Sequence, residues 1–307
     1  MGKAAERFKT IFLKFENSDI SISELSKLDI VRNIRKPRNR PLKWLLYVLI
    51  VIFFYVIFKN IEIFNNRKCL VQMPRDASKL FREPEYCDIC ETVDKVDKIS
   101  NVSPSYFLEE YIKPVRPVVV TDGALNWRAR SIFNFNFFKK LFTKIEINRS
   151  ENTGCQFFPY KTEFQSLEEV FGMNEARAML KPGEKPWYIG WNNCNDDAGK
   201  YLKQFYQKPY FLSNMTENIA LSWIFMGGPG HGAHMHVDNV HYPSWQAQLS
   251  GRKLWRLAPP PECYYKCKEL DVVVETGEII VLDTNRWYHQ TNVLPGELSI
   301  TIGSEFD

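Results

Sequence analysis

The sequence predicts a mainly β (α+β) fold in which helices precede a β-sandwich or barrel. Two observations lead to this expectation: short strand-like apolar runs follow one another closely after about residue 185, and glycine-containing turns separate several of them. Such series of short strands are typical of sandwiches and barrels. The expected strands are 187–191, 219–226, 233–238, 244–249, 253–257, 272–274, 278–282, 287–291 and 298–302.

The part of the chain before these strands divides into a stem and the start of the globular domain. Residues 59–100 are polar and interrupted by asparagine and proline, and we expect them to form the stem. The globular domain then covers 101–307. Near its start, 116–123 predicts a strand that runs into a turn, and 133–142 predicts an amphipathic helix.

Residues 44–58 form an uncharged apolar run without glycine or proline. A helix of this length spans only about 22 Å, short of a hydrocarbon core of about 30 Å, so Lys43 and Lys59 would have to extend to the interfaces. Because the run is apolar on every face, it favours a transmembrane signal anchor in contact with membrane lipid. The alternative is a buried core helix.

The formal net charge of +4 predicts topology rather than a binding partner. Residues 1–43 hold 11 Lys and Arg against 5 Asp and Glu, whereas the remainder holds 29 against 31. The remainder has no basic excess, so we expect no nucleic-acid partner. The basic flank predicts that 1–43 is a cytoplasmic tail and that 59–307 lies in the endoplasmic reticulum or Golgi lumen, or outside the cell, as in a type II membrane protein.

All seven cysteines lie beyond the apolar run, as do three N-glycosylation sequons, at Asn101, Asn148 and Asn214. An oxidising lumen favours structural disulfides. Cys87 and Cys90 have the spacing of a redox pair or of half a zinc site as well, and the sequence leaves the pairing of the cysteines open.

The five histidines all lie between His231 and His289. His236 and Asp238 are two residues apart, so on a strand their side chains point to the same face. Together with His289, on another expected strand, they form a set of two histidines and one carboxylate. Such a set leaves coordination positions open and suits non-haem Fe(II). His234 has the same parity as His236 and is either a rival ligand or a neighbour of the site.

Lys253 shares the parity of Trp255 and Leu257 on an expected strand, so its side chain should point to the apolar side. A lone buried ammonium costs several kcal/mol unless an anion meets it. The sequence therefore predicts either an anion site at Lys253 or a lysine that extends to solvent from the end of the strand.

Several spaced segments together carry a family resemblance. In chain order they are 116–123 followed by Asn126 and Trp127, then 227–238, 244–260, 275–282 and 287–289. In this order they resemble the Jumonji C (JmjC) family of 2-oxoglutarate oxygenases, and the resemblance covers roughly 105–307. Among its subfamilies the chain is most similar to the arginine demethylase and lysyl hydroxylase group once called phosphatidylserine receptor.

The resemblance implies a double-stranded β-helix, also called a cupin or JmjC barrel, with Fe(II) held by His236, Asp238 and His289. It implies 2-oxoglutarate as cosubstrate, bound through its distal carboxylate by Lys253, with further contacts from Thr301, Tyr188 and Gln246. The implied reaction uses O₂ to oxidise a protein or peptide side chain. Because the expected topology keeps the domain in the lumen, away from chromatin, we expect hydroxylation rather than demethylation.

Two positions depart from the family pattern. Ala233 stands where relatives commonly have a threonine that contacts the cosubstrate, and Gln246 stands where the most similar group has asparagine. These departures motivate an alternative interpretation, a catalytically silent JmjC-fold binding or scaffold protein of the secretory pathway. A zinc cupin with isomerase or hydrolase activity is a third interpretation.

Overall fold

The computed structural model describes residues 2–27, 40–60, 84–144, 156–214 and 223–307. The chain divides into two compact units, Met1–Leu80 and Phe81–Asp307.

The first unit contains the helices α1 (Gly2–Glu16), α2 (Ile22–Leu25) and α4 (Arg40–Asn60). The predicted transmembrane segment 44–58 lies within α4. In the part of the chain that the structure describes, no helix combines the length and the apolar character needed to cross a membrane. The predicted anchor is therefore not supported by the structure.

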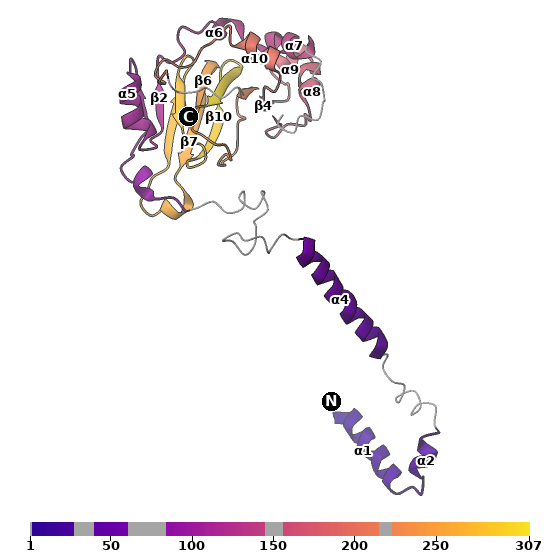
Figure 1. The fold of residues 1–307 in the computed structure, drawn as a ribbon. Coiled ribbons are helices and arrows are strands. Elements are labelled where there is room, and N and C mark those ends of the chain that lie inside the picture. Colours follow the sequence, from indigo (N-terminus) through magenta and orange to yellow (C-terminus); the bar gives the residue numbers. More distant parts are fainter. Residues whose placement is uncertain (1, 28–39, 61–83, 145–155, 215–222) are drawn as a thin grey trace. The chain divides into compact units, whose positions relative to one another are not determined.

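The second unit is built on two β-sheets, which confirms the mainly β prediction (Figure 1). Its described strands form an eight-stranded sheet in the order β1-β2-β9-β6-β11-β5-β4-β3 and a three-stranded sheet in the order β10-β7-β8. Neighbouring strands are antiparallel except β1 and β2, which are parallel. The strands are β1 (Asp97–Ile99), β2 (Val118–Val120), β3 (Phe157–Phe158), β4 (Tyr188–Asn192), β5 (Trp223–Gly227), β6 (Ser244–Ser250), β7 (Lys253–Ala258), β8 (Leu270–Val274), β9 (Ile279–Leu282), β10 (Tyr288–Val293) and β11 (Ser299–Glu305).

Short helices lie mostly before the long strands in the chain, as expected. In Figure 1 the helices α7 to α10 are grouped on one side of the strands. The helical segments are η2 (Cys87–Ile89), α5 (Pro104–Phe107), η3 (Leu108–Ile112), α6 (Ala129–Ile132), α7 (Phe135–Lys144), α8 (Leu167–Gly172), α9 (Glu175–Ala178), α10 (Asp196–Leu202) and η4 (Pro261–Cys263).

Helix α7 corresponds to the amphipathic helix expected at 133–142, shifted by two residues. Phe135, Phe138 and Phe142 are spaced by three and four residues and are buried. This spacing puts the three rings on one helical face, so the helix forms because that face packs into the core.

Strand β9 shows how the eight-stranded sheet is buried on both faces. Ile279 and Val281 belong to one apolar core, which includes the helices, whereas Ile280 and Leu282 belong to a second core. The second core also contains Trp255 and other residues of the three-stranded sheet. The space between the two sheets is therefore a packed interior. Successive residues of β9 point alternately into one core and into the other.

One expected strand is absent from the structure. The segment 233–238 forms a single bridge between His236 and His289 rather than a strand. Further hydrogen bonds hold the segment in place: the Ala233 carbonyl accepts from the Thr291 amide at 3.0 Å, and the Thr284 carbonyl accepts from the Asp238 amide at 2.9 Å.

The second unit begins earlier than the boundary expected at 101. Ile89, Val93 and Val96, from the segment expected as stem, are buried in the second core. The unit itself starts at Phe81. Packing of these side chains, together with covalent links, incorporates 84–100 into the domain.

Two disulfides make these covalent links. They join Cys87 to Cys263 and Cys90 to Cys267, across sequence separations of 176 and 177 residues. Cys194 is disulfide-bonded as well. The pair Cys87 and Cys90 is therefore structural, and each member bonds to η4 or the turn that follows it rather than to the other.

Candidate metal centre

The backbone bridge between His236 and His289 builds the centre of the site. The His236 amide donates to the His289 carbonyl at 3.1 Å, and the His289 amide donates to the His236 carbonyl at 2.8 Å. Two residues paired in this way project their side chains to the same side. The two imidazole centroids lie 4.3 Å apart as a result.

Asp238 completes a cluster of three possible metal ligands. One ligand atom from each of His236, Asp238 and His289 lies within 4.8 Å of the others. The Nε2 atom of His236 is 3.3 Å from Asp238 Oδ1, and the Nε2 atom of His289 is 3.8 Å from Asp238 Oδ2. Both imidazoles therefore present Nε2, and not Nδ1, to the carboxylate.

The Nδ1 atoms of the two histidines are held by carbonyls of the residues two positions earlier. Nδ1 of His236 lies 2.6 Å from the His234 carbonyl oxygen, and Nδ1 of His289 lies 3.2 Å from that of Trp287. Because a carbonyl oxygen only accepts, each Nδ1 carries the proton. Each Nε2 of a neutral ring then has a free lone pair, as a metal ligand requires.

Burial and charge together set the protonation of the cluster. Burial lowers the pKa of His289 to about 4, so its imidazole is neutral. Burial alone would lower the pKa of His236 and raise the pKa of Asp238, but the hydrogen bond between the two side chains reverses both shifts. His236 is therefore the imidazole that protonates more readily, and its Nε2 can bind a metal once it has lost that proton. Two imidazole nitrogens and one carboxylate are the donor set expected for a two-histidine, one-carboxylate metal site, and the residues present fit such a metal.

Access to the cluster comes from the His236 and Asp238 side. Their side chains are 25% and 31% exposed, whereas the side chain of His289 is 4% exposed. Trp255 covers His289, with nearly parallel rings 6.0 Å apart. A metal held here would be shielded on one side and open on the other.

Lys253 is fully buried and has no acidic partner among the described residues. Its Nζ donates to Thr301 Oγ1 at 2.5 Å and lies over the rings of Tyr188 and Phe225, at 5.2 and 5.5 Å from their centroids. Burial lowers the pKa of Lys253 to about 7. The prediction that its side chain points inward is therefore correct, and the extended alternative is wrong.

Of the three other residues expected to contact the cosubstrate, two lie against Lys253 among the described residues. Thr301 and Tyr188 both contact it, as described above. Gln246 shares a face of β6 with Gln248, yet the amide that reaches Thr301 belongs to Gln248: Thr301 Oγ1 donates to Gln248 Oε1 at 3.1 Å. Gln248 was not singled out from the sequence, although its parity with Gln246 was a usable signal.

Tyr160 is a second residue that the sequence did not indicate. Its ring centroid lies 5.5 Å from that of Tyr188. Burial raises the pKa of Tyr160, and the negative charge of Asp238 raises it further. Tyr160 is therefore near both Asp238 and Tyr188, one of the residues that contact Lys253. It follows the two-residue strand β3, and no local sequence motif marks it.

His234 does not join the cluster. Its side chain is exposed, its ring centroid lies 5.3 Å from that of His236, and its contribution to the site is the carbonyl described above. This finding removes His234 as a rival ligand.

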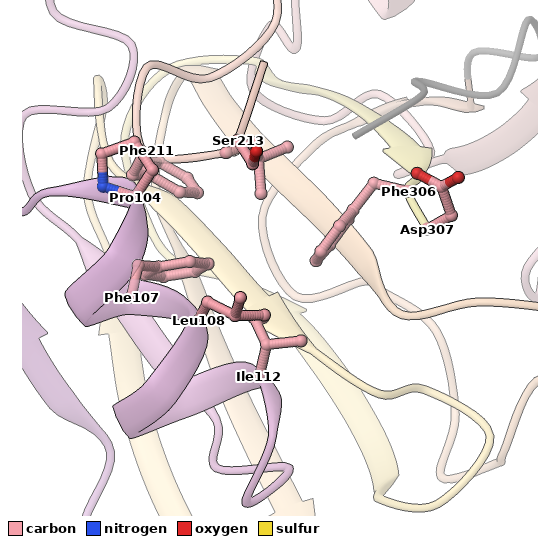
Figure 2. Close-up of a pocket in the computed structure, with 9 residues that line it drawn as sticks. Pro104, Phe107, Leu108, Ile112, Phe211, Ser213, Phe306 and Asp307 are labelled. Atoms are coloured by element: carbon pink, nitrogen blue, oxygen red, sulfur yellow. The ribbon is translucent and has the colours of Figure 1, made fainter. Parts of the chain in front are cut away.

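A separate apolar hollow of about 360 Å³ lies on the second unit (Figure 2). Phe107, Leu108 and Ile112 line one side of it, and Phe211 and Phe306 also contribute. None of the three clustered ligands, and neither Lys253 nor Thr301, lines this hollow. It therefore takes no part in the chemistry of the cluster.

Comparison with known families supports the fold. The model of a family described as a cupin-like domain matches residues 104–267, which is more than half of the chain. The chain belongs to this cupin-like domain family. The matched residues include strands of both β-sheets.

Individual relatives are distant. This chain is 25% identical over 248 residues to "Arginine-specific demethylase JMJ20" of Arabidopsis thaliana. That alignment covers 63% of this chain and 53% of the relative. It is 21% identical to "2-oxoglutarate and iron-dependent oxygenase JMJD4" of Danio rerio (78% and 65% covered). It is 22% identical to "Bifunctional arginine demethylase and lysyl-hydroxylase psr-1" of Caenorhabditis elegans (60% and 44% covered). The chain spans about half of the length of these relatives.

Replacing His236 or His289 with alanine should abolish high-affinity binding of a divalent metal, because two ligands no longer hold the ion in a fixed geometry. His234→Ala is the matched control and should retain binding within about threefold, because only its carbonyl takes part. Calorimetric titration with Mn(II) measures both. Loss of binding in His234→Ala with retention in His289→Ala would contradict this ligand assignment.

Proposed function

We propose that this protein is an Fe(II)- and 2-oxoglutarate-dependent oxygenase that hydroxylates a protein side chain. The observation that carries the proposal is the coexistence, between the same two sheets, of a two-histidine, one-carboxylate cluster and a buried lysine without an acidic partner among the described residues. The relative JMJD4 is named a 2-oxoglutarate and iron-dependent oxygenase, which supports the same cofactors.

Contacts between side chains connect the two halves of the proposed site. Lys253 lies over the ring of Tyr188, Tyr188 packs against Tyr160, and the pKa of Tyr160 is raised by burial and by the charge of Asp238. A dicarboxylate that reaches from the metal ligands to Lys253 would therefore lie along these two tyrosines. We propose that Lys253 binds its distal carboxylate.

Bound Fe(II) and 2-oxoglutarate would supply the oxidising chemistry, in which O₂ and 2-oxoglutarate yield succinate, CO₂ and one oxygen atom for the substrate. The residues of the chain contribute binding and orientation. His236, Asp238 and His289 would hold the metal through preset lone pairs. Trp255 and the buried side of the cluster exclude water, and the open side at His236 and Asp238 would admit the substrate.

Lys253→Met tests the proposed function, because it removes the anion partner and leaves the metal ligands in place. We expect wild-type protein with Fe(II) and 2-oxoglutarate to form succinate and to add one oxygen to an acceptor protein in a luminal extract. Lys253→Met should form at least 100-fold less succinate, bind Mn(II) normally, and gain about 1–3 kcal/mol in free energy of unfolding, since an apolar side chain replaces a buried amine.

Succinate assays, intact-mass spectrometry and urea unfolding measure these quantities. Wild-type protein that binds metal but forms no more succinate than Lys253→Met would contradict the oxygenase proposal. It would favour the catalytically silent scaffold, which the departures at Ala233 and Gln246 from the family pattern motivate.

We further propose that the domain faces an oxidising lumen of the secretory pathway. The disulfides Cys87–Cys263 and Cys90–Cys267 support this placement, because such bonds persist in oxidising compartments. Attachment to the membrane through 44–58 belongs to the same proposal and rests on the sequence pattern. Asn101 is exposed and available for glycosylation.

Glycosidase treatment of the full chain expressed in cells tests this placement. We expect the treatment to increase electrophoretic mobility, and Asn101→Gln should remove one glycan from the untreated protein. Intact microsomes should also protect 84–307 from added protease. An unchanged mobility together with digestion of 84–307 would contradict a luminal domain.

A further inference from the structure

Thr301 has a single hydroxyl proton and two polar neighbours. When Lys253 is protonated, as it must be to bind an anion, its Nζ can only donate, and it lies 2.5 Å from Thr301 Oγ1, which must therefore accept. The hydroxyl proton is directed to the Oε1 atom of Gln248 at 3.1 Å. In this arrangement Thr301 turns an oxygen lone pair, rather than a proton, toward the Lys253 pocket.

The amide of Gln248 is held in this orientation from its other end. Its Nε2 donates to the Ser250 carbonyl at 2.7 Å and to Ser299 Oγ at 2.9 Å. Since a carbonyl oxygen only accepts, the nitrogen must face Ser250, and Oε1 must then face Thr301. The residue is 1% exposed, so bulk water offers no substitute partner.

Strand pairing places an amide opposite Thr301. From Thr301 to Glu305, β11 pairs with β6 in one continuous register, in which Gln248 stands opposite Thr301. A β-bulge interrupts this register between Ile300 and Thr301, so that Ile300 pairs with Ser250 and Leu249 is passed over. The continuous register therefore puts a polar side chain with a fixed acceptor beside the proposed anion site.

We propose that Gln248 is a positioning residue that lowers the affinity of this site for the distal carboxylate of 2-oxoglutarate, because its Oε1 accepts the hydroxyl proton of Thr301. This inference rests on the proposed function. If Thr301 donated to a bound carboxylate, Gln248 would retain a buried acceptor without a partner. That cost is comparable to the gain of the new hydrogen bond. Lys253 alone then provides the net attraction for the anion.

Gln248→Met removes the competing acceptor at nearly constant volume. Thr301 can then donate to the carboxylate without that cost, so we expect the dissociation constant for 2-oxoglutarate to fall about tenfold. The same change should lower the melting temperature, because the Ser250 carbonyl and the Ser299 hydroxyl lose a donor. A purely structural role would lower the melting temperature without tightening the binding.

Calorimetry of the full chain loaded with Fe(II) under anaerobic conditions measures the binding of 2-oxoglutarate. Gln246→Met is the matched comparison on the same strand and face, and it is not expected to tighten binding. Thr301→Val should change the dissociation constant by no more than about threefold. The double variant with Gln248→Met and Thr301→Val should lose the gain, because Gln248 acts through the hydroxyl of Thr301.

The outcomes separate this inference from the proposed function. Equal or weaker binding by Gln248→Met, or tighter binding that persists in the double variant, would overturn the role of Gln248 while leaving the cosubstrate assignment intact. If neither wild-type protein nor Gln248→Met binds 2-oxoglutarate, the proposed cosubstrate is wrong and the inference falls with it.

Discussion

The hydrogen bond between Lys253 and Thr301 is the constraint on which the proposed anion site depends. It joins a strand of the three-stranded sheet to a strand of the eight-stranded sheet through a fully buried amine. Burial lowers the pKa of Lys253 to about 7. The buried amine therefore reduces the free energy of unfolding at neutral pH. Such a cost is expected where a residue serves binding rather than folding.

The metal-ligand cluster depends on a different constraint, which is local. A single bridge joins the backbones of His236 and His289, and each imidazole donates from Nδ1 to a carbonyl two residues earlier. The protonation and direction of both rings are thus determined by nearby backbone rather than by distant side chains. The disulfides join parts of the chain that are far apart in sequence. They fix the segment around Cys87 and Cys90 to the second core, which also contains Trp287.

The sequence predicted most of the fold and the composition of the site, but not the details that depend on register. Alternation along β7 was enough to place Lys253 inward. The sequence placed His236 and Asp238 together on an expected strand, whereas the structure brings them together through an isolated bridge at His236 and the bond from the Asp238 amide to Thr284. The register that sets Gln248 opposite Thr301 cannot be seen in the pattern of β6, since it arises from pairing with another strand. The inclusion of 84–100 in the domain depends on disulfide pairing, which the sequence leaves open.

The pH dependence of 2-oxoglutarate binding tests most directly whether Lys253 is the anion partner. Below a pKa of about 7 the amine is already protonated, so affinity should be constant; above it, each binding event must take up a proton. The dissociation constant should therefore rise by up to about tenfold per pH unit between pH 7 and 9. Calorimetry of the metal-loaded chain in buffers of different ionisation enthalpy would detect this proton uptake. An affinity that stays constant from pH 6 to 9, with no proton uptake, would contradict the account.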